Sequence, residues 1–158
     1  MTPPFVLLLA FLIGVISGLR SLTAPAVVAW AAHRGWVNLS NTPLHFMGST
    51  PAVAVFIVLA IVEIVADKLP STPSRTAPVG LIARVVLGAL SGAAVALAGA
   101  QSLAIGGVLG AVGGIAGAFG GYQVRTRLVK ALHVPDFVIA ILEDALAIGA
   151  GLFLMSRF

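Results

Sequence analysis

The chain has 158 residues, of which 59% are hydrophobic and only 9% are charged. A soluble domain carries roughly 25% charged and about 45–50% apolar residues, so this chain has too little polar surface to cover a water-soluble globule. Its mean hydropathy of +1.12 agrees. These values exclude a soluble enzyme, a disordered chain and a nucleic-acid-binding module as first interpretations. They predict an integral membrane protein that contacts the lipid bilayer.

The sequence contains no cysteine and has a formal net charge of +4. A disulfide, a thiolate metal site and a cysteine nucleophile are therefore impossible. In a membrane protein, an excess of basic residues usually marks the cytoplasmic loops. Residues 1–4 contain no basic residue before the first apolar run, so we expect that run to stay in the mature protein rather than to be cleaved as a signal peptide.

Apolar runs near twenty residues predict membrane-spanning helices, because a helix rises about 1.5 Å per residue and the hydrocarbon core is about 30 Å thick. The expected helices cover residues 5–32, 51–66, 79–100, 103–122 and 136–155. They predict an all-α bundle of about five transmembrane helices that forms a single domain over residues 1–158. The hydrophilic connections are residues 33–50, 67–78 and 123–135, and residues 99–102 form a tight turn.

The first of these runs is longer than one span and contains Arg20 and Pro25. Proline removes a helical hydrogen bond and disfavours helical geometry in the residue before it. Residues 18–25 are thus a kink, a break between two helices, or the tip of a re-entrant pair. We favour a single kinked and tilted helix.

The distribution of lysine and arginine predicts the orientation. In a five-span protein, the connections 67–78 and 123–135 lie on one side, which carries Lys68, Arg75, Arg125, Arg127 and Lys130. The opposite side carries Arg34 and Arg157. This asymmetry predicts a multi-pass protein of the cell membrane, with the N-terminus in the cytoplasm and the C-terminus outside.

Glycines recur at spacings of three and four in the first, third and fourth predicted helices. Residues at these spacings share one helix face, and the missing side chains let another backbone approach closely in lipid. The pattern predicts tight helix packing, within the subunit or in a homo-oligomer; a smooth sliding surface or a narrow pore lining is the alternative. These residues are Gly14, Gly18, Gly88, Gly92, Gly106, Gly110, Gly113, Gly114, Gly117 and Gly121.

Charged residues inside the predicted helices are the most informative ones. A charge at the centre of a membrane helix costs about 2.5–3.5 kcal/mol, so it usually faces the protein interior and is paired. Glu63, Arg84, Glu143 and Asp144 lie at similar depths from the cytoplasmic side of the five-span topology. In one interpretation, Arg84 pairs with Glu63 or Glu143 as a structural ion pair. In the other, the acids form a cation or proton site.

The second interpretation makes Arg20 and Arg84 the counter-charges of Glu63, Glu143 and Asp144, which leaves one acid in excess. An excess acid in lipid must be protonated, hydrated or bound to an ion. We therefore predict a small transporter or channel-like protein for a cation or proton. The alternative is a structural or accessory scaffold whose ion pairs only hold the bundle together.

Two pairs of segments resemble each other. Residues 14–20 and 117–125 are glycine-rich stretches that end in arginine, and residues 56–63 and 137–143 are apolar stretches that end in glutamate. With the third predicted helix between them, the two pairs have opposite orientations. Inverted repeats are common in transporters, so we consider a possible inverted 2+1+2 repeat.

The sequence contains no visible enzyme constellation. His33, His45 and His133 lie in the connections without metal-ligand spacing, and neither a nucleophile elbow nor a phosphate-binding loop is present. We expect a protein that is not an enzyme and that needs no metal or cofactor. Asp67 and Lys68 lie at the membrane edge, where we interpret them as helix-end and loop charges.

Several motifs are similar to those of a known family. They are Gly18-Leu19-Arg20 with the downstream Pro25, residues 48–52 (Gly-Ser-Thr-Pro-Ala) followed by residues 62–70 (Val-Glu-Ile-Val-Ala-Asp-Lys-Leu-Pro), and the pair Glu143-Asp144. They resemble the signature of the bacterial membrane family named domain of unknown function 4126, over most of the chain. The resemblance implies a small multi-spanning bacterial membrane protein. It highlights Arg20, Glu63, Asp67, Lys68, Glu143 and Asp144 without assigning them roles.

Overall fold

The computed structural model describes residues 1–67 and 76–158, and these residues fold into α-helices with one short 3-10 helix and no strand. The prediction of an all-α fold is therefore confirmed. The elements are α1 (Pro3–Leu19), α2 (Thr23–His33), η1 (His45–Gly48), α3 (Thr50–Ala66), α4 (Pro78–Ala98), α5 (Leu103–Leu132) and α6 (Asp136–Met155).

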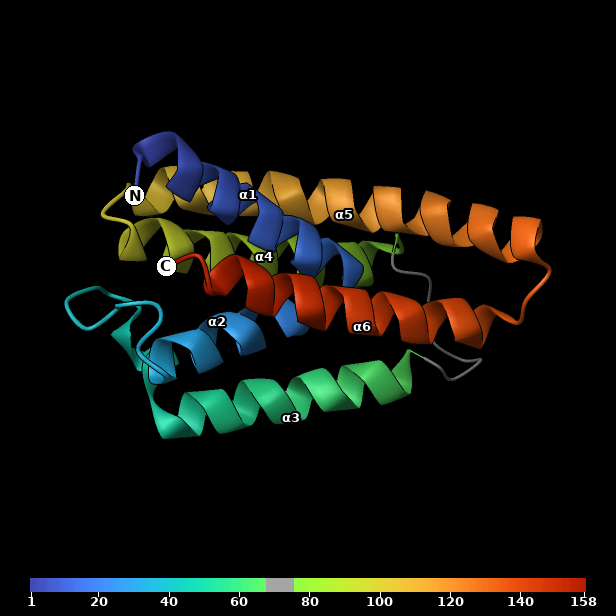
Figure 1. The fold of residues 1–158 in the computed structure, drawn as a ribbon, viewed down its shortest axis with the longest axis horizontal. Helices are drawn as coiled ribbons and strands as arrows, with labels where there is room; N and C mark the ends of the chain where they lie inside the picture. Colours follow the sequence, from blue (N-terminus) through green and yellow to red (C-terminus); the bar gives the residue numbers. More distant parts are fainter. Residues whose placement is uncertain (68–75) are drawn as a thin grey trace.

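The α-helices lie roughly along one long axis, and consecutive α-helices run in opposite directions (Figure 1). One end of the bundle, which we call the terminal end, contains both chain termini, the loop over residues 34–44 and the turn over residues 99–102 (Figure 1). The opposite end contains the last turns of α5 and residues 133–135, and we call it the basic end. The two ends would face opposite sides of a membrane if the long axis crosses it.

Among the described helices, α4, α5 and α6 are long and apolar enough to cross a membrane. α1 and α3 are also apolar, but each has 17 residues, which reach about 25 Å against a core of about 30 Å. The 11 residues of α2 reach only about 16 Å. The fold is therefore that of a helical protein with membrane-length helices, and the count of five spans stays a prediction.

The prediction of one kinked helix over residues 5–32 is wrong. α1 ends at Leu19, the chain turns, and α2 begins at Thr23 and runs back toward the terminal end (Figure 1). Pro25 is the third residue of α2, where a helical N–H has no acceptor in any case. The first hydrogen bond of α2 runs from the Ala26 N–H to the Leu22 carbonyl, at 3.1 Å. Pro25 thus begins a new helix rather than kinking an existing one.

The predicted end of the fourth helix near residue 122 is also wrong, because α5 continues to Leu132. The helix stops at His133, whose φ of 54° lies in the left-handed region. With 30 residues, α5 is about 45 Å long and exceeds the hydrocarbon core. The expected polar connection over residues 123–135 is therefore mostly helical.

The α1–α2 hairpin changes the topology. Both termini lie at the terminal end (Figure 1), whereas the predicted N-terminus in the cytoplasm and C-terminus outside required one span over residues 5–32. The inverted 2+1+2 repeat is not supported either. α1 and α3 run in the same direction, but α5 and α6 run in opposite directions (Figure 1), so the two pairs do not correspond.

α5 packs between α1 and α4 through glycine backbone. A Cβ added at Gly92 of α4 would lie 2.5 Å from the Gly106 carbonyl oxygen, and Gly113 and Gly117 on the neighbouring face of α5 meet the backbone of α1 just as closely. The two overlapping glycine series thus serve two different neighbours within the subunit. The glycines buried in this three-helix contact are Gly14, Gly18, Gly88, Gly92, Gly106, Gly110, Gly113, Gly114 and Gly117.

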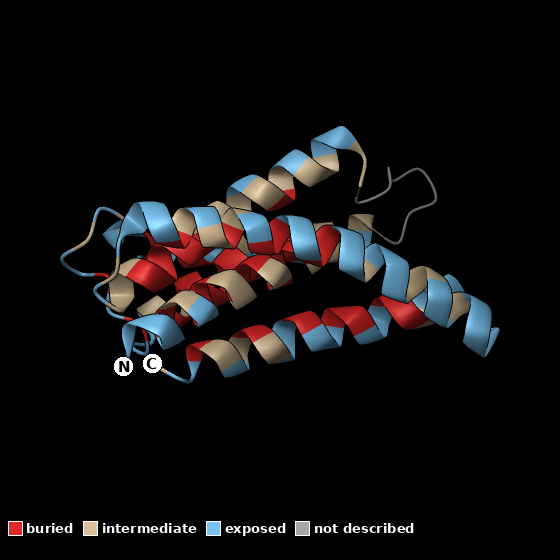
Figure 2. Cartoon of the chain, turned by 90° about the horizontal axis from the view of Figure 1, so that it is seen from above, coloured by how far each residue is buried: buried red, intermediate tan, exposed pale blue. Residues whose placement is uncertain are grey.

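The core lies where α1, α2, α4, α5 and α6 face one another, and the buried positions of Figure 2 mark these facing sides. Ile13, Val28 and Val95 are among its fully buried side chains. α3 is peripheral, because it packs chiefly on α2 and η1 and buries only Val53 and Ala60. Most of its surface is apolar and exposed, as expected of a helix that faces lipid.

We expect Gly110→Ala to lower the free energy of unfolding by about 1–3 kcal/mol, the usual cost of overpacking a tight core. The added methyl group would collide with the backbone of Gly88. Gly120→Ala, on the same helix with no atom within 4 Å of its Cβ position, is the matched control. Unfolding in mixed detergent micelles, followed by circular dichroism, measures both. Equal stability of the two variants would contradict this packing.

Candidate functional site

Charged side chains from the α1–α2 turn, from the end of α3, and from α4 and α6 meet at the turn. Arg20 is 0% exposed, Arg84 is 5% exposed and Asp144 is 7% exposed, while Glu63 and Asp67 are half-buried. We call these five residues the charge cluster. Buried charges are tolerated only when they are paired or hydrogen-bonded, so the contacts of each residue decide what the cluster can do.

Arg20 lies in the turn itself and joins α3 to α6. Its Nη1 donates a hydrogen bond to Oδ2 of Asp67, the residue that ends α3. Its Nε lies 2.5 Å from Oδ1 of Asp144 as an ion pair, without the alignment of a hydrogen bond. Nη2 is buried with no hydrogen-bond partner among the described residues. One guanidinium is therefore shared by two carboxylates from different helices.

Glu63 caps the beginning of α2 from the neighbouring helix α3. Its Oε1 accepts hydrogen bonds from the Ser21 N–H at 2.8 Å and the Ser21 hydroxyl at 2.5 Å. Its Oε2 accepts one from the Leu22 N–H at 2.8 Å. The first N–H groups of a helix have no partner within the helix, and the positive end of the helix dipole favours a carboxylate there. Glu63 thus supplies the acceptors that the turn lacks.

Arg84 donates hydrogen bonds at the C-terminal end of α1, whereas Glu63 accepts them at the start of α2. Its Nε donates to the Gly18 carbonyl at 3.1 Å and its Nη1 to the Gly80 carbonyl at 3.0 Å. Ser17 reinforces this contact, because its hydroxyl donates to the Arg84 carbonyl at 3.0 Å. The last carbonyls of a helix and its negative dipole end favour a cation. Arg84 Nη2 also lies 3.9 Å from Oδ2 of Asp67, which links it to the rest of the cluster.

Glu143 belongs to a second group of charges toward the basic end. Successive residues of a helix point about 100° apart, so Glu143 and its neighbour Asp144 face different partners. Glu143 Oε2 lies 3.5 Å from Arg125 Nη1. Arg125 also donates two hydrogen bonds to Asp136, from Nε at 2.9 Å and from Nη2 at 2.5 Å. This group ties α5 to the start of α6.

Glu63, Glu143 and Asp144, which were predicted to form one site, therefore contact different partners. The predicted pairing of Arg84 with Glu63 or Glu143 is not the arrangement found, because Glu63 caps α2 and Glu143 faces Arg125. Asp67, expected to be a membrane-edge charge, does end α3 but also reaches Arg20. Lys68 lies outside the described residues.

The role of Ser17 and Ser21 at the turn was not predicted from the sequence. Ser21 bonds Glu63, and Ser17 bonds the Arg84 carbonyl. The signal was present: a serine or threonine shortly before a proline is typical of a helix start, and residues 21–25 contain Ser21, Thr23 and Pro25. Asp136 was missed as well, although an acid directly after Pro135 is a usual feature of the first turn of a helix.

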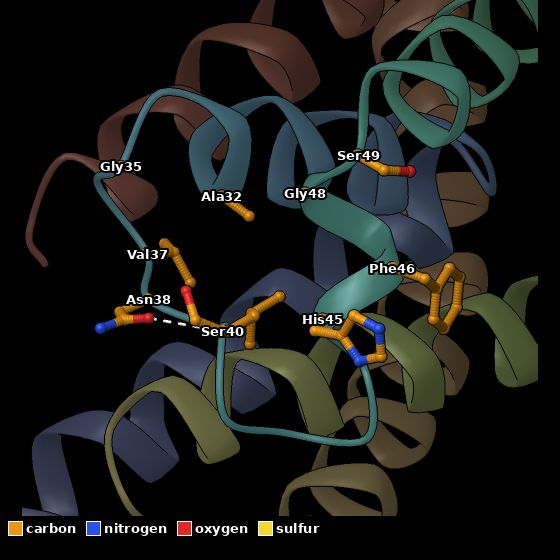
Figure 3. Close-up of a pocket in the computed structure, with 10 residues that line it drawn as sticks. Ala32, Gly35, Val37, Asn38, Ser40, His45, Phe46, Gly48 and Ser49 are labelled. Carbon is orange, nitrogen blue, oxygen red and sulfur yellow. Dashed lines mark hydrogen bonds between the residues drawn. The ribbon is translucent and has the colours of Figure 1, made fainter.

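A hollow of about 780 Å³ with mixed polar and apolar lining lies at the terminal end, and Figure 3 shows its lining residues. The end of α2, the following loop and η1 line it. The Asn38 side-chain oxygen accepts a hydrogen bond from the Ser40 N–H at 3.1 Å, and His45 Nδ1 lies 3.1 Å from the Thr42 carbonyl oxygen.

Over residues 1–67 and 76–158, no group of three or more His, Cys, Asp or Glu residues is arranged to hold a metal ion.

Apolar helices of membrane length around paired internal charges are the features expected of a helical membrane protein. The chain belongs to the family described as domain of unknown function 4126, whose match covers residues 7–156, so the resemblance seen in the sequence is confirmed. Comparisons with curated proteins and with solved structures found no match. The family has no assigned activity, and any function has to be argued from the site.

We expect Glu63→Ala to loosen the start of α2 without unfolding α1. Loss of a helix N-cap costs about 1 kcal/mol, so hydrogen exchange at the amides of residues 21–24 and 26 should become about fivefold faster. Asp136→Ala, which removes an acid from the first turn of α6, is the control and should leave residues 21–26 unchanged. Unchanged protection in Glu63→Ala would show that the carboxylate does not hold the turn.

Proposed function

We propose that this protein is a small transporter or channel-like protein for a proton or a small cation, and that it is not an enzyme. Asp67 and Asp144 bind the ion, with Arg20 and Arg84 as counter-charges. The observation that carries the proposal is the shared guanidinium: Arg20 is 0% exposed and lies between two carboxylates at a helix break. Ionisable residues inside membrane helices commonly mark ion pathways or proton relays.

The helix break supports this proposal. Many transporters build their ion sites where a membrane helix is interrupted, because the free helix ends present backbone groups and partial charges to the site. Here the end of α1 and the start of α2 meet at Arg20. Arg84 is six residues into α4, about 9 Å along its axis, so the site lies nearer the basic end than the terminal end.

The chemistry of the shared guanidinium gives the site two states. When a proton or cation neutralises Asp144, the attraction between Arg20 and α6 weakens and Arg20 is held mainly by Asp67. When the ion binds Asp67, the attraction to α3 weakens instead. α3 packs chiefly on α2 and η1, and its end at the cluster is held by Asp67 and by the hydrogen bonds of Glu63 to the α1–α2 turn. Ion binding is thus coupled to the contact between α3 and the bundle.

Glu63 and Glu143, which the sequence also suggested as ion-binding residues, stabilise the surrounding helices in this proposal. Glu63 accepts hydrogen bonds from the turn, and Glu143 lies beside Arg125.

For orientation, we propose that the basic end faces the cytoplasm, since Arg125, Arg127 and Lys130 lie there and cytoplasmic ends are enriched in basic residues. We place the protein in the inner membrane of a bacterium. Both termini then lie on the side opposite the cytoplasm.

A structural scaffold or accessory subunit is the second candidate, and one observation favours it. Glu63 and Arg84 supply the bonds that the free helix ends need, which by itself explains their presence in an apolar bundle. In this case the ion pairs hold the hairpin in place, and neutralising them affects folding or partner binding, not ion flux. The glycines buried between helices suit a rigid scaffold equally well.

We expect purified wild-type protein in liposomes to conduct protons or a small cation, and Asp144→Asn to abolish that flux. Glu143→Gln is the matched control, because it neutralises the adjacent residue of the same helix, which is equally buried; it should retain flux. Circular dichroism and gel filtration establish that each variant is folded, and Asp67→Asn replaces Asp144→Asn if the latter is not.

Three results separate the candidates. Flux in the wild type and in Glu143→Gln, but not in folded Asp144→Asn, supports the ion site at Arg20. Flux that persists in both Asp67→Asn and Asp144→Asn rules that site out. Absence of wild-type flux for protons, Na⁺ and K⁺ favours the scaffold, which then predicts that Asp144→Asn is less stable than the wild type.

A further inference from the structure

Two buried polar atoms near the α1–α2 turn have no hydrogen-bond partner among the described residues. One is Nη2 of Arg20 and the other is Oγ1 of Thr23, in residues that are 0% and 3% exposed. A buried N–H or O–H group without a partner costs free energy, so such groups are nearly always hydrogen-bonded in proteins. Where the protein itself offers no partner, a buried water molecule usually does. The two atoms therefore mark a hydration site.

Both side chains reach residues of α3 and of α6. Arg20 contacts Asp67 at the end of α3 and Asp144 of α6. Thr23 lines a groove of about 200 Å³ together with residues of α2, α3 and α6, among them Ile148 of α6. Ile148 lies four residues after Asp144, and residues at this spacing share one helix face. The groove at Thr23 thus continues along α6 toward the carboxylate that Arg20 contacts.

A water molecule suits this place in both size and chemistry. It needs roughly 10–15 Å³ of cavity and about two to four polar partners, and the groove beside Thr23 is larger than that. A guanidinium N–H only donates a hydrogen bond, whereas a threonine hydroxyl both donates and accepts one. Water accepts the bond from Arg20, and its own protons reach the hydroxyl and the nearby carboxylate oxygens.

The contacts of the charge cluster suit a proton better than a metal cation. The cluster has two arginines and three acids, so one proton makes it neutral. A metal cation needs several oxygen ligands at once, about 6–8 for Ca²⁺ and rings of carbonyl oxygens for K⁺. Here the two oxygens of Glu63 already accept three hydrogen bonds. Asp67 and Asp144 both contact Arg20, whose charge is permanent. A proton needs only one carboxylate oxygen.

We propose that Arg20 Nη2 and Thr23 Oγ1 hold buried water beside Asp144, and that the ion which this water delivers is a proton. The inference rests on the proposed ion site and names its ion. In the transfer, an O–H bond of a hydronium ion breaks and a carboxylate oxygen of Asp144 forms the new O–H bond, which leaves a neutral water and a neutral carboxylic acid. The charged groups around this step are Arg20, Glu63, Asp67, Arg84, Arg125 and Glu143.

Solid-state NMR of the full-length protein in liposomes tests the water site without measuring transport. Magnetisation that starts on water should reach the side-chain nitrogens of Arg20, as it reaches those of the exposed Arg127. Thr23→Val keeps the shape but removes the hydroxyl, and should lower the Arg20 signal about fivefold, the effect of one lost hydrogen bond. Thr126→Val, which removes a hydroxyl that donates to the Tyr122 carbonyl on α5, is the matched control and should not change it. A signal at Arg127 without one at Arg20, or an Arg20 signal that Thr23→Val leaves unchanged, overturns the proposal.

Ion flux through the same liposomes identifies the ion. The wild type should carry protons down a pH gradient but neither Na⁺ nor K⁺. Thr23→Val should carry protons about fivefold more slowly, and Thr23→Ser, which keeps a hydroxyl, should retain the wild-type rate; Thr23→Ala replaces Thr23→Val if the latter does not fold. Na⁺ or K⁺ flux without proton flux overturns this inference and leaves the proposed function standing. Absence of flux for all three ions contradicts the proposed function itself, and the proton assignment falls with it.

Discussion

The pairing of two free helix ends by charged side chains is the interaction on which this structure depends. The turn between α1 and α2 leaves N–H and C=O groups without helical partners in an apolar bundle, where each unpaired group costs several kcal/mol. Glu63 accepts the N–H bonds at 2.8 Å and Arg84 donates to the Gly18 carbonyl at 3.1 Å. These bonds come from α3 and α4, so the turn also fixes where those helices lie.

The charge cluster and an apolar groove between α5 and α6 are two consequences of the same break. Because α1 stops early, Arg20 lies at a turn instead of within a helix, and its guanidinium reaches carboxylates of both α3 and α6. For the same reason α1 contributes no side chain beyond Leu19, and an apolar groove of about 280 Å³, lined by Leu19 and by residues of α5 and α6, opens there. A continuous first helix would have placed Arg20 on a helix face and filled the groove.

Features set by local periodicity could be predicted from the sequence, whereas features set by distant contacts could not. The glycine spacing on α5 predicted tight helix packing, because spacing decides which positions share a face without side chains, and these glycines meet the backbones of α1 and α4. The break near Arg20 was one of three alternatives, and the kinked helix was wrongly preferred, because Pro25 suits both a kink and a helix start. Glu63 and Arg84, which stabilise the break, lie 42 and 66 residues from their partners Ser21 and Gly18. The wrong topology and the unsupported inverted repeat both followed from interpreting residues 5–32 as one kinked helix.

The most direct test of the helix break is the side of the membrane on which each loop lies. The chain has no cysteine, so single exposed positions can be labelled with a membrane-impermeant maleimide in intact cells and in inverted vesicles. The hairpin predicts that Thr2→Cys, Ser40→Cys and Ser156→Cys are labelled from one side and Lys130→Cys from the other. Labelling of Thr2→Cys and Ser40→Cys from opposite sides would contradict the account, since one continuous helix would then cross the membrane between them.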